Sequence, residues 1–408
     1  MEEAIIRIRD VKKYYQMGSE AIHAVDGISL NIRQGEILCL LGKSGSGKST
    51  LIKQVLKEID LPYLFVTGDD VSSDNNTWIS ETWNTARSIM KIRKYEVFIL
   101  VIDEIHKIKN WSEAVKKEWD IDTFNDLELR VVILGSSRLL IKDGLTESLT
   151  GRYELIRMSH WSYDEMHDAF GFDIEQYIYY GGYPGGASFI NNERRWQQYM
   201  KDSIIAPAVQ KDILMTKVIY KPQLMKQLFE LGCTYSGEEI SFTKLLGQLQ
   251  DVGNVTTLTT LDESRLLCGM QKYANDNARK YNSIPKMMVY NTALLSALSN
   301  TTFEKTYISP KVWGRWVESA IGSYLLNKAD ELDFRLYYWR ENNDEVDFVI
   351  EQNKQCIAIE VKSGKRTTNN GLSVFTNKFQ PKHSFVVGSG GIPVEDFLTL
   401  DIENLFEL

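Results

Sequence analysis

The sequence has few cysteines, no long apolar run and no signal-like amino terminus, and each shortage excludes a class of protein. Its four cysteines, at positions 39, 233, 268 and 356, form no CxxC pair, so neither a zinc site nor a disulfide framework is indicated. The apolar run at 97–102 is six residues long, far short of the roughly 18 that cross a bilayer. The chain begins Met-Glu-Glu, where a signal peptide would be basic and then apolar. We therefore expect a cytoplasmic protein without a membrane span.

An excess of positive charge is also missing. The chain has 47 Lys and Arg against 55 Asp and Glu, a formal net charge of −8. A protein that coats nucleic acid by bulk electrostatics needs many cations to neutralise phosphates. Of the segments 1–200, 201–300 and 301–408, only 201–300 holds more basic than acidic residues. Any contact with DNA is therefore expected to be local.

What is present is the composition of an ordinary globular chain with several domains. Hydrophobic residues make up 43% and charged residues 25%, which excludes wholesale disorder and a coiled coil. At about 150 residues per domain, 408 residues predict two to three domains.

A glycine-rich stretch fits the phosphate-binding pattern GxxxxGK[ST]. Its members are Gly42, Lys43, Ser44, Gly45, Ser46, Gly47, Lys48, Ser49 and Thr50. Residues 36–41 before it read as a buried strand, and residues 51–56 after it continue as a helix. In that context backbone N–H groups converge on the phosphates, Lys48 reaches the β and γ phosphates, and the Ser49 hydroxyl ligates Mg²⁺. The stretch therefore predicts binding of ATP together with Mg²⁺.

Two further apolar strands end in residues that suit hydrolysis. The strand 98–102 ends in Asp103 and Glu104, and parallel strands deliver such carboxylates to the open edge of a sheet. Asp103 would hold Mg²⁺ through water, and Glu104 would polarise the attacking water as general base. Ser136, just after the strand 130–134, is placed to orient that water.

Short stretches around the P-loop share a second pattern. They are a first strand at 5–8, the pair Tyr14-Tyr15, residues 24–30 and the pair Gly35-Glu36. With these, residues 4–50 resemble the front of an ABC transporter nucleotide-binding subunit, which implies that an aromatic near Tyr15 stacks on adenine. No LSGGQ-like signature precedes Asp103, and Lys48 and Asp103 are too close in sequence for the helical insertion of those subunits. A transporter ATP-binding subunit is therefore a third hypothesis that rests on residues 4–50 alone.

From about residue 54 onward, longer stretches follow another pattern. They are 101–108 with Trp111, 134–137, 144–152, 160–161, 181–185 and 211–214. In these the chain resembles a family of prokaryotic AAA+ ATPases with a PD-(D/E)xK-like domain of unknown function at the carboxyl end. The resemblance implies an α/β fold: a P-loop NTPase parallel sheet, a helical lid, a winged-helix-like middle and a carboxyl-terminal restriction-endonuclease-like domain. The P-loop departs from that family, because Lys43-Ser44 stands where Pro-Arg is usual.

Arg152, within this second resemblance, has three interpretations. It is a candidate γ-phosphate contact in its own subunit, a contact supplied to a neighbouring subunit, or a surface arginine. The second is compatible with a homo-oligomer, because AAA+ proteins often form rings in which an arginine completes the next subunit's site.

The last hundred residues carry a second set of acidic and basic residues. Asp347 lies on a predicted strand at 346–350, and Glu360 and Lys362 share one face of a strand at 356–362 because they are two residues apart. In a predicted helix at 312–326, Glu318 lies between two glycines at spacings of four, which permits close approach. The pattern resembles PD-(D/E)xK nucleases, which implies that Asp347 and Glu360 bind Mg²⁺ and that Lys362 positions or activates water. The alternative is a β-hairpin with a charged exposed face.

Residues 241–267 suggest two short helices joined by a glycine-containing turn, with Ser241 as an N-cap. Such a pair suits a winged-helix DNA-binding unit, and it lies in the slightly basic segment. A helical subdomain that merely packs against the ATPase is the alternative.

Together these features predict four regions. They are a P-loop NTPase core at 1–165 with an ABC-like front at 1–50, a helical lid at 166–235, a winged-helix-like domain at 236–300 and a nuclease-like domain at 301–408. The leading hypothesis is an ATP hydrolase coupled to a Mg²⁺-dependent nuclease-like domain that acts on DNA. The second is a nucleotide-switched protein that binds DNA or protein without cleavage.

Overall fold

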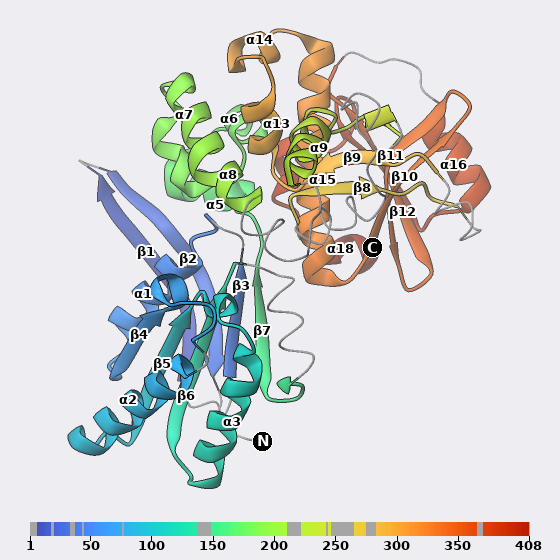
Figure 1. The fold of residues 1–408 in the computed structure, drawn as a ribbon. Coiled ribbons are helices and arrows are strands. Elements are labelled where there is room, and N and C mark those ends of the chain that lie inside the picture. The colour runs from blue at the N-terminus through green and yellow to red at the C-terminus, as the bar shows by residue number, and fades with distance from the viewer. Residues whose placement is uncertain are drawn as a thin grey trace. The chain divides into compact units, whose positions relative to one another are not determined.

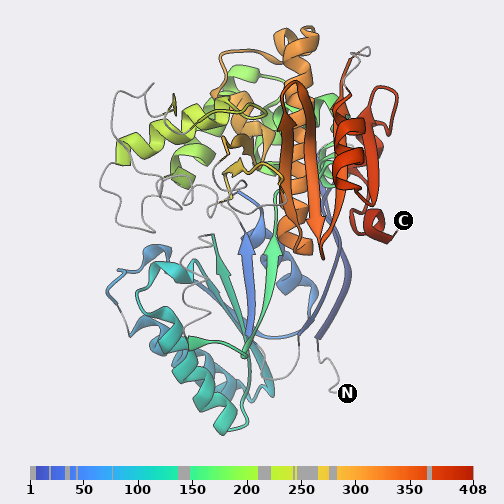
Figure 2. The same cartoon turned by 90° about the vertical axis from the view of Figure 1, so that its right-hand side faces the viewer.

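The computed structural model describes residues 6–17, 20–32, 37–42, 45–75, 77–136, 148–209, 222–241, 244–245, 265–274, 283–364 and 370–407. The chain divides into two compact units, Met1–Ser159 and His160–Leu408. Figures 1 and 2 draw their ribbons from two directions. Within these described ranges, none of the helices combines the length and the apolar character that a bilayer crossing requires.

The first unit is an α/β fold around a parallel sheet. Its strands lie in the order β4-β5-β6-β3-β7, and each adjoining pair is parallel. A separate antiparallel pair joins β1 and β2. The elements are β1 Ile6–Met17, β2 Glu20–Ile32, β3 Ile37–Gly42, α1 Lys48–Glu58, β4 Tyr63–Thr67, η1 Gly68–Asp70, α2 Trp78–Arg93, β5 Val97–Asp103, η2 Ile105–Lys107, α3 Trp111–Phe124, β6 Glu128–Gly135 and β7 Tyr153–Met158. The predicted strands at 36–41, 98–102 and 130–134 and the helix after the P-loop are confirmed.

The central strands of this sheet are apolar throughout because both faces are covered. In β3, Ile37 and Cys39 belong to a core formed with α2 and α3, whereas Leu38 and Leu40 belong to a core formed with α1. Successive side chains of a strand point to opposite faces, so a continuous apolar run is what a strand buried on both sides requires. The helices therefore lie in layers on either side of the sheet, and the predicted α/β class is confirmed.

The second unit combines helices with two sheets. A pair of antiparallel strands, β8-β9, stands beside a sheet of order β10-β11-β12-β13, in which only β12 and β13 are parallel. The helices of its first part are α5 Tyr163–Phe170, α6 Ile174–Tyr180, η3 Pro184–Phe189, α7 Glu193–Tyr199, η4 Met200–Ile205, α8 Ala206–Ala208 and α9 Pro222–Thr234. The remaining elements are β8 Leu267–Met270, β9 Lys286–Val289, α13 Thr292–Leu298, α14 Phe303–Tyr307, α15 Pro310–Leu332, β10 Arg335–Glu341, β11 Asp344–Gln352, β12 Gln355–Lys362, α16 Gly371–Phe379, β13 His383–Gly388, α17 Val394–Leu398 and α18 Glu403–Glu407.

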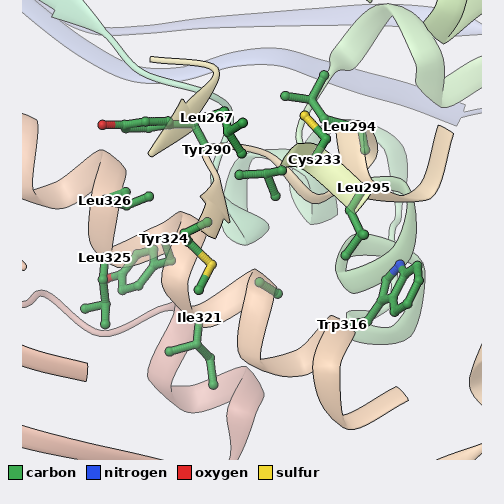
Figure 3. Packing of buried hydrophobic residues seen from close by; sticks show 14 of the residues in the cluster. Cys233, Leu267, Tyr290, Leu294, Leu295, Trp316, Ile321, Tyr324, Leu325 and Leu326 are labelled. Carbon is green, nitrogen blue, oxygen red and sulfur yellow. The ribbon is translucent and has the colours of Figure 1, made fainter. Parts of the chain in front are cut away.

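The long helix α15 organises the core of this unit. Figure 3 shows its side chains gathered with apolar side chains of α9, α13 and the β8-β9 pair. The labelled residues are Cys233, Leu267, Tyr290, Leu294, Leu295, Trp316, Ile321, Tyr324, Leu325 and Leu326. The other face of the β10–β13 sheet carries a smaller core in which Phe375 of α16 meets Trp339. The sheet therefore lies between α15 and α16, and the strands and helix predicted at 312–362 are confirmed.

The predicted winged-helix-like region is only partly within the described residues. Residues 242–243, 246–264 and 275–282 lie outside them, and these hold most of the two predicted helices. Ser241 does accept a hydrogen bond from the Lys244 amide at 3.2 Å, as an N-cap does. Leu267, where the second helix was expected to end, begins strand β8.

Candidate functional site

The P-loop turns directly from strand β3 into helix α1. Gly45 and Gly47 have φ angles of 84° and 85°, which are left-handed values that glycine adopts without strain. Gly47 is the N-cap of α1, and the helix begins at Lys48. A helix that starts in this way directs its first backbone N–H groups toward a bound anion. Lys43 and Ser44 lie outside the described residues.

Gly42 at the end of β3 has a packing role. A Cβ atom built there would lie 2.7 Å from Ser46 Oγ and 3.0 Å from Met158 Cβ. The loop folds back so closely on the strand end that only glycine fits without a shift. This close packing holds the loop at the carboxyl edge of the parallel sheet, where ligands of such sheets bind.

The predicted acidic pair forms a tight turn at the same edge. Strand β5 ends at Asp103, whose Oδ1 accepts a hydrogen bond from the Glu104 amide at 2.9 Å. Glu104 has a φ of 52°, a left-handed value that non-glycine residues seldom adopt. A Cβ atom on Gly68 would lie 2.8 Å from the Glu104 carbonyl oxygen, so the chain after β4 packs tightly under this turn.

The Glu104 carboxylate contacts two other predicted site residues, Lys48 and Ser136. Lys48 Nζ lies 3.0 Å from Glu104 Oε1, and the Ser136 hydroxyl donates a hydrogen bond to Glu104 Oε2 at 3.0 Å. His106 Nε2 lies 3.4 Å from the same Oε2. His106 was not predicted as a site residue, although its position two residues after the acidic pair was the available signal.

The charge of Glu104 is set by these neighbours. Burial acts to raise its pKa, but the charges of Lys48 and His106 and the hydrogen bonds from Lys48 and Ser136 together hold the pKa below its ordinary value. The carboxylate therefore stays ionised at neutral pH and is able to accept a proton from water.

The donor set at this edge suits Mg²⁺. Ser49 lies next to Lys48 at the first turn of α1, and Asp103 ends β5, which β6 separates from β3. Hydroxyl and carboxylate oxygens are the ligands Mg²⁺ takes from proteins, and it completes its shell with water and substrate phosphates.

Arg152 lies at the opposite end of the sheet from the P-loop. Its carbonyl accepts a hydrogen bond from the amide of Ile37, the first residue of β3, whereas the P-loop follows the last. Its side chain contacts α3, with Nε 3.4 Å from Asp120 Oδ1 and the guanidinium 5.3 Å from the Trp119 ring. A γ-phosphate contact within its own subunit does not fit this placement. For Tyr15, the structure describes the strand β1 but not the side chain.

A second cluster forms where the nuclease resemblance predicted one. Glu318 of α15, Asp347 of β11 and Glu360 of β12 all reach it. The Val361 amide donates a hydrogen bond to Asp347 Oδ2 at 2.7 Å, and Lys362 Nζ lies 3.6 Å from Glu360 Oε1.

The glycines on either side of Glu318 let helix α15 approach its neighbours closely, as predicted. A Cβ on Gly314 would lie 2.7 Å from Ser363 Oγ, at the end of β12, and one on Gly322 would lie 2.8 Å from Met288 Cε on β9. The helix α15 therefore lies against both strands at this point.

The centre of this cluster is occupied by a lysine that the sequence reasoning missed. Lys286, the first residue of β9, contacts Glu318 Oε1 and lies 3.5 Å from Asp347 Oδ1. Burial acts to lower the pKa of Lys286, but Glu318 and Asp347 raise it above its ordinary value, so the side chain is an ammonium ion. The available signal was a lysine at the head of an apolar run, because a buried lysine needs an acidic partner.

Two acids of the cluster, Glu318 and Glu360, have a pKa above the ordinary value. Burial raises the pKa of Glu318 to about 7, against the charge of Lys286. Burial and the charge of Asp347 raise the pKa of Glu360 to about 7, against the charge of Lys362. In the described residues, no group of three or more His, Cys, Asp or Glu side chains is arranged to hold a metal ion.

Comparisons with known proteins match three parts of the chain. Residues 34–167 match an AAA domain, residues 171–305 match a domain of unknown function, and residues 313–398 match a second domain of unknown function. The AAA match covers the P-loop, the acidic turn and Ser136. The chain thus carries an AAA-type P-loop ATPase domain, followed by regions that the families leave without a function.

Curated relatives match the chain over short stretches. A lipoprotein-releasing system ATP-binding protein of Rickettsia bellii is 42% identical over 52 residues, 13% of this chain and 24% of the relative. An uncharacterised ABC transporter ATP-binding protein of Methanocaldococcus jannaschii is 39% identical over 71 residues, 17% of this chain and 28% of the relative. The chain therefore spans less than a third of the length of these relatives, and the partial ABC resemblance is confirmed.

Two solved structures are similar to the chain at low sequence identity. The Walker-type ATPase of Pyrococcus abyssi gives a TM-score of 0.45 at 14% identity, covering 64% of this chain and 90% of that chain. A component of a Clostridium perfringens ABC transporter complex gives 0.24 at 16% identity, covering 35% of this chain and 82% of that chain.

Proposed function

We propose that the AAA domain binds ATP with Mg²⁺ and hydrolyses it. The observation that carries the proposal is the contact of one carboxylate, Glu104, with both Lys48 of the P-loop and Ser136 of the neighbouring strand. Three residue types required by phosphoryl transfer thus meet at the carboxyl edge of one parallel sheet.

The geometry supports a sequence of contacts. Phosphate oxygens of ATP would draw the Lys48 ammonium away from Glu104, because three negatively charged oxygens outcompete one carboxylate for it. Glu104, still held by the Ser136 hydroxyl, would then face the γ-phosphate and accept the proton of the attacking water. Ser49 and Asp103 would hold Mg²⁺, which neutralises charge on the phosphates.

The proposal is tested by ATP turnover of Lys48→Ala. We expect turnover to fall about 100-fold or more, since loss of one preorganised electrostatic group costs roughly 10²–10³ in rate. Lys53→Ala is the matched control: it removes an exposed lysine of the same helix that contacts only the Phe65 ring in the described residues. Equal turnover in the wild type and both variants would refute ATP hydrolysis at this loop.

For the second unit, the sequence resemblance supplies the first candidate, a nuclease-like module acting on DNA under control of ATP. It is supported by the meeting of Glu318, Asp347 and Glu360 with Lys362. Magnesium-dependent cleavage of plasmid and linear DNA, measured with and without ATP, tests it. Cleavage that survives Asp347→Ala combined with Glu360→Ala would exclude these residues as the source.

One observation favours the second candidate, a nucleotide-switched protein that binds DNA or protein without cutting. Lys286 already pairs with Glu318 and with Asp347, and Asp347 is one of the two carboxylates that the nuclease resemblance assigns to the metal. This candidate predicts ATP-dependent binding of DNA, with unchanged DNA length on a denaturing gel. Stimulation of ATP turnover by DNA without cleavage products would decide for it.

Two interpretations of Arg152 remain: a contact supplied to the site of a neighbouring copy, and a surface arginine held by Asp120 and the Trp119 ring. A homo-oligomer that forms with ATP and is lost in Arg152→Ala, detected by light scattering, would support the first of these. Cytoplasmic localisation stays a prediction from the sequence.

A further inference from the structure

We propose that Lys286 is the resident cation of the carboxyl-terminal cluster and pairs with Asp347, one of the two carboxylates that the nuclease resemblance assigns to Mg²⁺. The residues present do not fit a divalent metal, and the domain holds its carboxylates together without one. The inference deepens the second candidate function of this unit and is independent of ATP hydrolysis by the first unit.

The first reason is occupancy. The Lys286 ammonium contacts Glu318 Oε1 and lies 3.5 Å from Asp347 Oδ1. A Mg²⁺ ion shared by these two oxygens would lie about 2.0–2.1 Å from each of them. That position coincides with the space that the ammonium fills, so lysine and metal exclude each other both sterically and by charge.

The second reason is the shortage of free oxygen ligands. Asp347 Oδ2 already accepts the Val361 amide at 2.7 Å, and Glu360 Oε1 lies 3.6 Å from Lys362 Nζ. Glu360 Oε2 is buried without a hydrogen-bond partner. Because Mg²⁺ is usually held by only one or two protein carboxylates, the contacts that Asp347 and Glu360 already make with Val361 and Lys362 weaken the site that they could offer.

The third reason is that Lys286 cannot leave easily. Its strand β9 is bound on one side to β8, and on the other the Met287 amide donates a hydrogen bond to the Glu238 carbonyl at 3.0 Å. The following residues Met287, Met288 and Val289 are fully buried. Lys286 itself is 7% exposed, so an ammonium displaced from its two carboxylates would be an unpaired buried charge, which is strongly unfavourable.

What the cluster does follows from these contacts. Lys286, Glu318 and Asp347 come from β9, α15 and β11, so one ammonium fixes three elements relative to one another. Glu318 and Asp347 pair with this lysine of the protein itself. The unit therefore does not cut phosphodiesters through a metal at this position.

Binding of Mn²⁺ to the nucleotide-free chain, followed by electron paramagnetic resonance, tests the proposal. We expect the wild type and Asp347→Asn to bind Mn²⁺ equally, because the wild-type cluster holds none. Lys286→Gln should gain one Mn²⁺ site at least about tenfold tighter than any in the wild type, and Lys286→Gln with Asp347→Asn should lose it. Lys362→Gln is the matched control, because it removes the same charge at the more exposed edge of the cluster and should gain nothing.

Two results would overturn the proposal: wild-type Mn²⁺ binding abolished by Asp347→Asn, or a folded Lys286→Gln that gains no site. Circular dichroism establishes folding of each variant. If Lys286→Gln does not fold, the comparison of wild type with Asp347→Asn decides alone. ATP turnover of the same wild-type sample is read separately, so its absence would refute the proposed ATPase while leaving the lysine inference standing.

Discussion

The two units each bury a lysine against a carboxylate, yet the two ion pairs differ in what surrounds them. Lys48 is 6% exposed and Lys286 is 7% exposed, so burial does not separate them. Lys48 faces one carboxylate, that of Glu104, at the start of a helix whose first amides await an anion. Lys286 lies between two carboxylates on a strand that is bonded on both sides.

The difference indicates which ion pair a ligand can open. At Lys48 a phosphate offers a stronger partner than the single carboxylate it replaces, and the freed Glu104 keeps its contact with Ser136. At Lys286 an incoming cation would have to displace the ammonium, which would then need another partner. A lysine beside an acid is therefore a ligand site only where the surroundings supply an alternative for both partners.

The largest effect should come from the acid of the first pair. Glu104→Gln keeps the shape of the side chain but removes the proton acceptor, so ATP turnover should fall about 10²–10⁴-fold while ATP binding persists. Glu360→Gln, the same change in the second cluster, should leave turnover in the absence of DNA within about twofold. Comparable losses in both variants would remove the functional distinction between the clusters.

The same substitution at the two lysines should affect stability unequally. Lys286→Met leaves two buried carboxylates without their cation and should destabilise the second unit by about 3–5 kcal/mol. Lys48→Met leaves Glu104 with Ser136 and His106 and should therefore destabilise the first unit less than Lys286→Met destabilises the second. Hydrogen exchange during urea unfolding measures the stability of each unit. Equal losses of stability in the two variants would contradict the difference between the two lysines.

The pH dependence of stability should have opposite sign in the two clusters. Glu360 has a folded pKa of about 7 against an ordinary value of 4.5, so between these values the folded chain binds more protons than the unfolded chain. Stability of the second unit should therefore fall by about 1–3 kcal/mol as pH rises from 4.5 to 7, and then level off.

Glu104 gives the reverse sign, because its folded pKa lies below its ordinary value. Its contribution to the stability of the first unit is present at pH values above the ordinary pKa and is lost as the pH falls through the folded pKa. Urea midpoints of each unit against pH test both directions. Glu360→Gln should reduce the slope of the second unit, and the remaining slope should come from Glu318, whose pKa is also raised to about 7. If the slope of stability against pH is the same in Glu360→Gln as in the wild type, the slope belongs to another titrating group.

The smallest effect should come from the hydroxyl that holds the base. Ser136→Ala removes one hydrogen bond to Glu104 and should lower ATP turnover about tenfold, since such a bond contributes roughly 1–1.5 kcal/mol. Ser88→Ala, whose hydroxyl bonds only the Asn84 carbonyl on an exposed helix face, is the control. An unchanged rate in Ser136→Ala would show that the contact with His106 suffices to position the base.

The first site was predictable because its signals are local. A glycine pattern bounded by a strand and a helix, and an apolar strand that ends in two acids, each identify their own element. Parallel strands then bring Lys48, Glu104 and Ser136 to one edge without further information. The placement of Arg152 needed the order of strands, because its own neighbours in sequence do not reveal that it lies beside the start of β3.

The second site was predictable only in part because its centre is not local. The spacing of Glu360 and Lys362 and the glycines beside Glu318 were visible in the sequence, and the structure brings these residues together. Lys286 lies 61 residues from Asp347 and belongs to no motif. Only the three-dimensional pairing of β9 with the segment 238–240 brings its side chain between the two acids.

The left-handed backbone of Glu104 limits which residues can serve at its position. A φ of 52° disfavours β-branched side chains outright, and it is tolerated best by asparagine, aspartate and glycine. Glu104→Asn should therefore preserve the turn and still shorten the side chain by one methylene, out of reach of Lys48. The backbone of this turn thus restricts variation independently of chemistry, so that a chain that lost the base could still keep the shape built to present it.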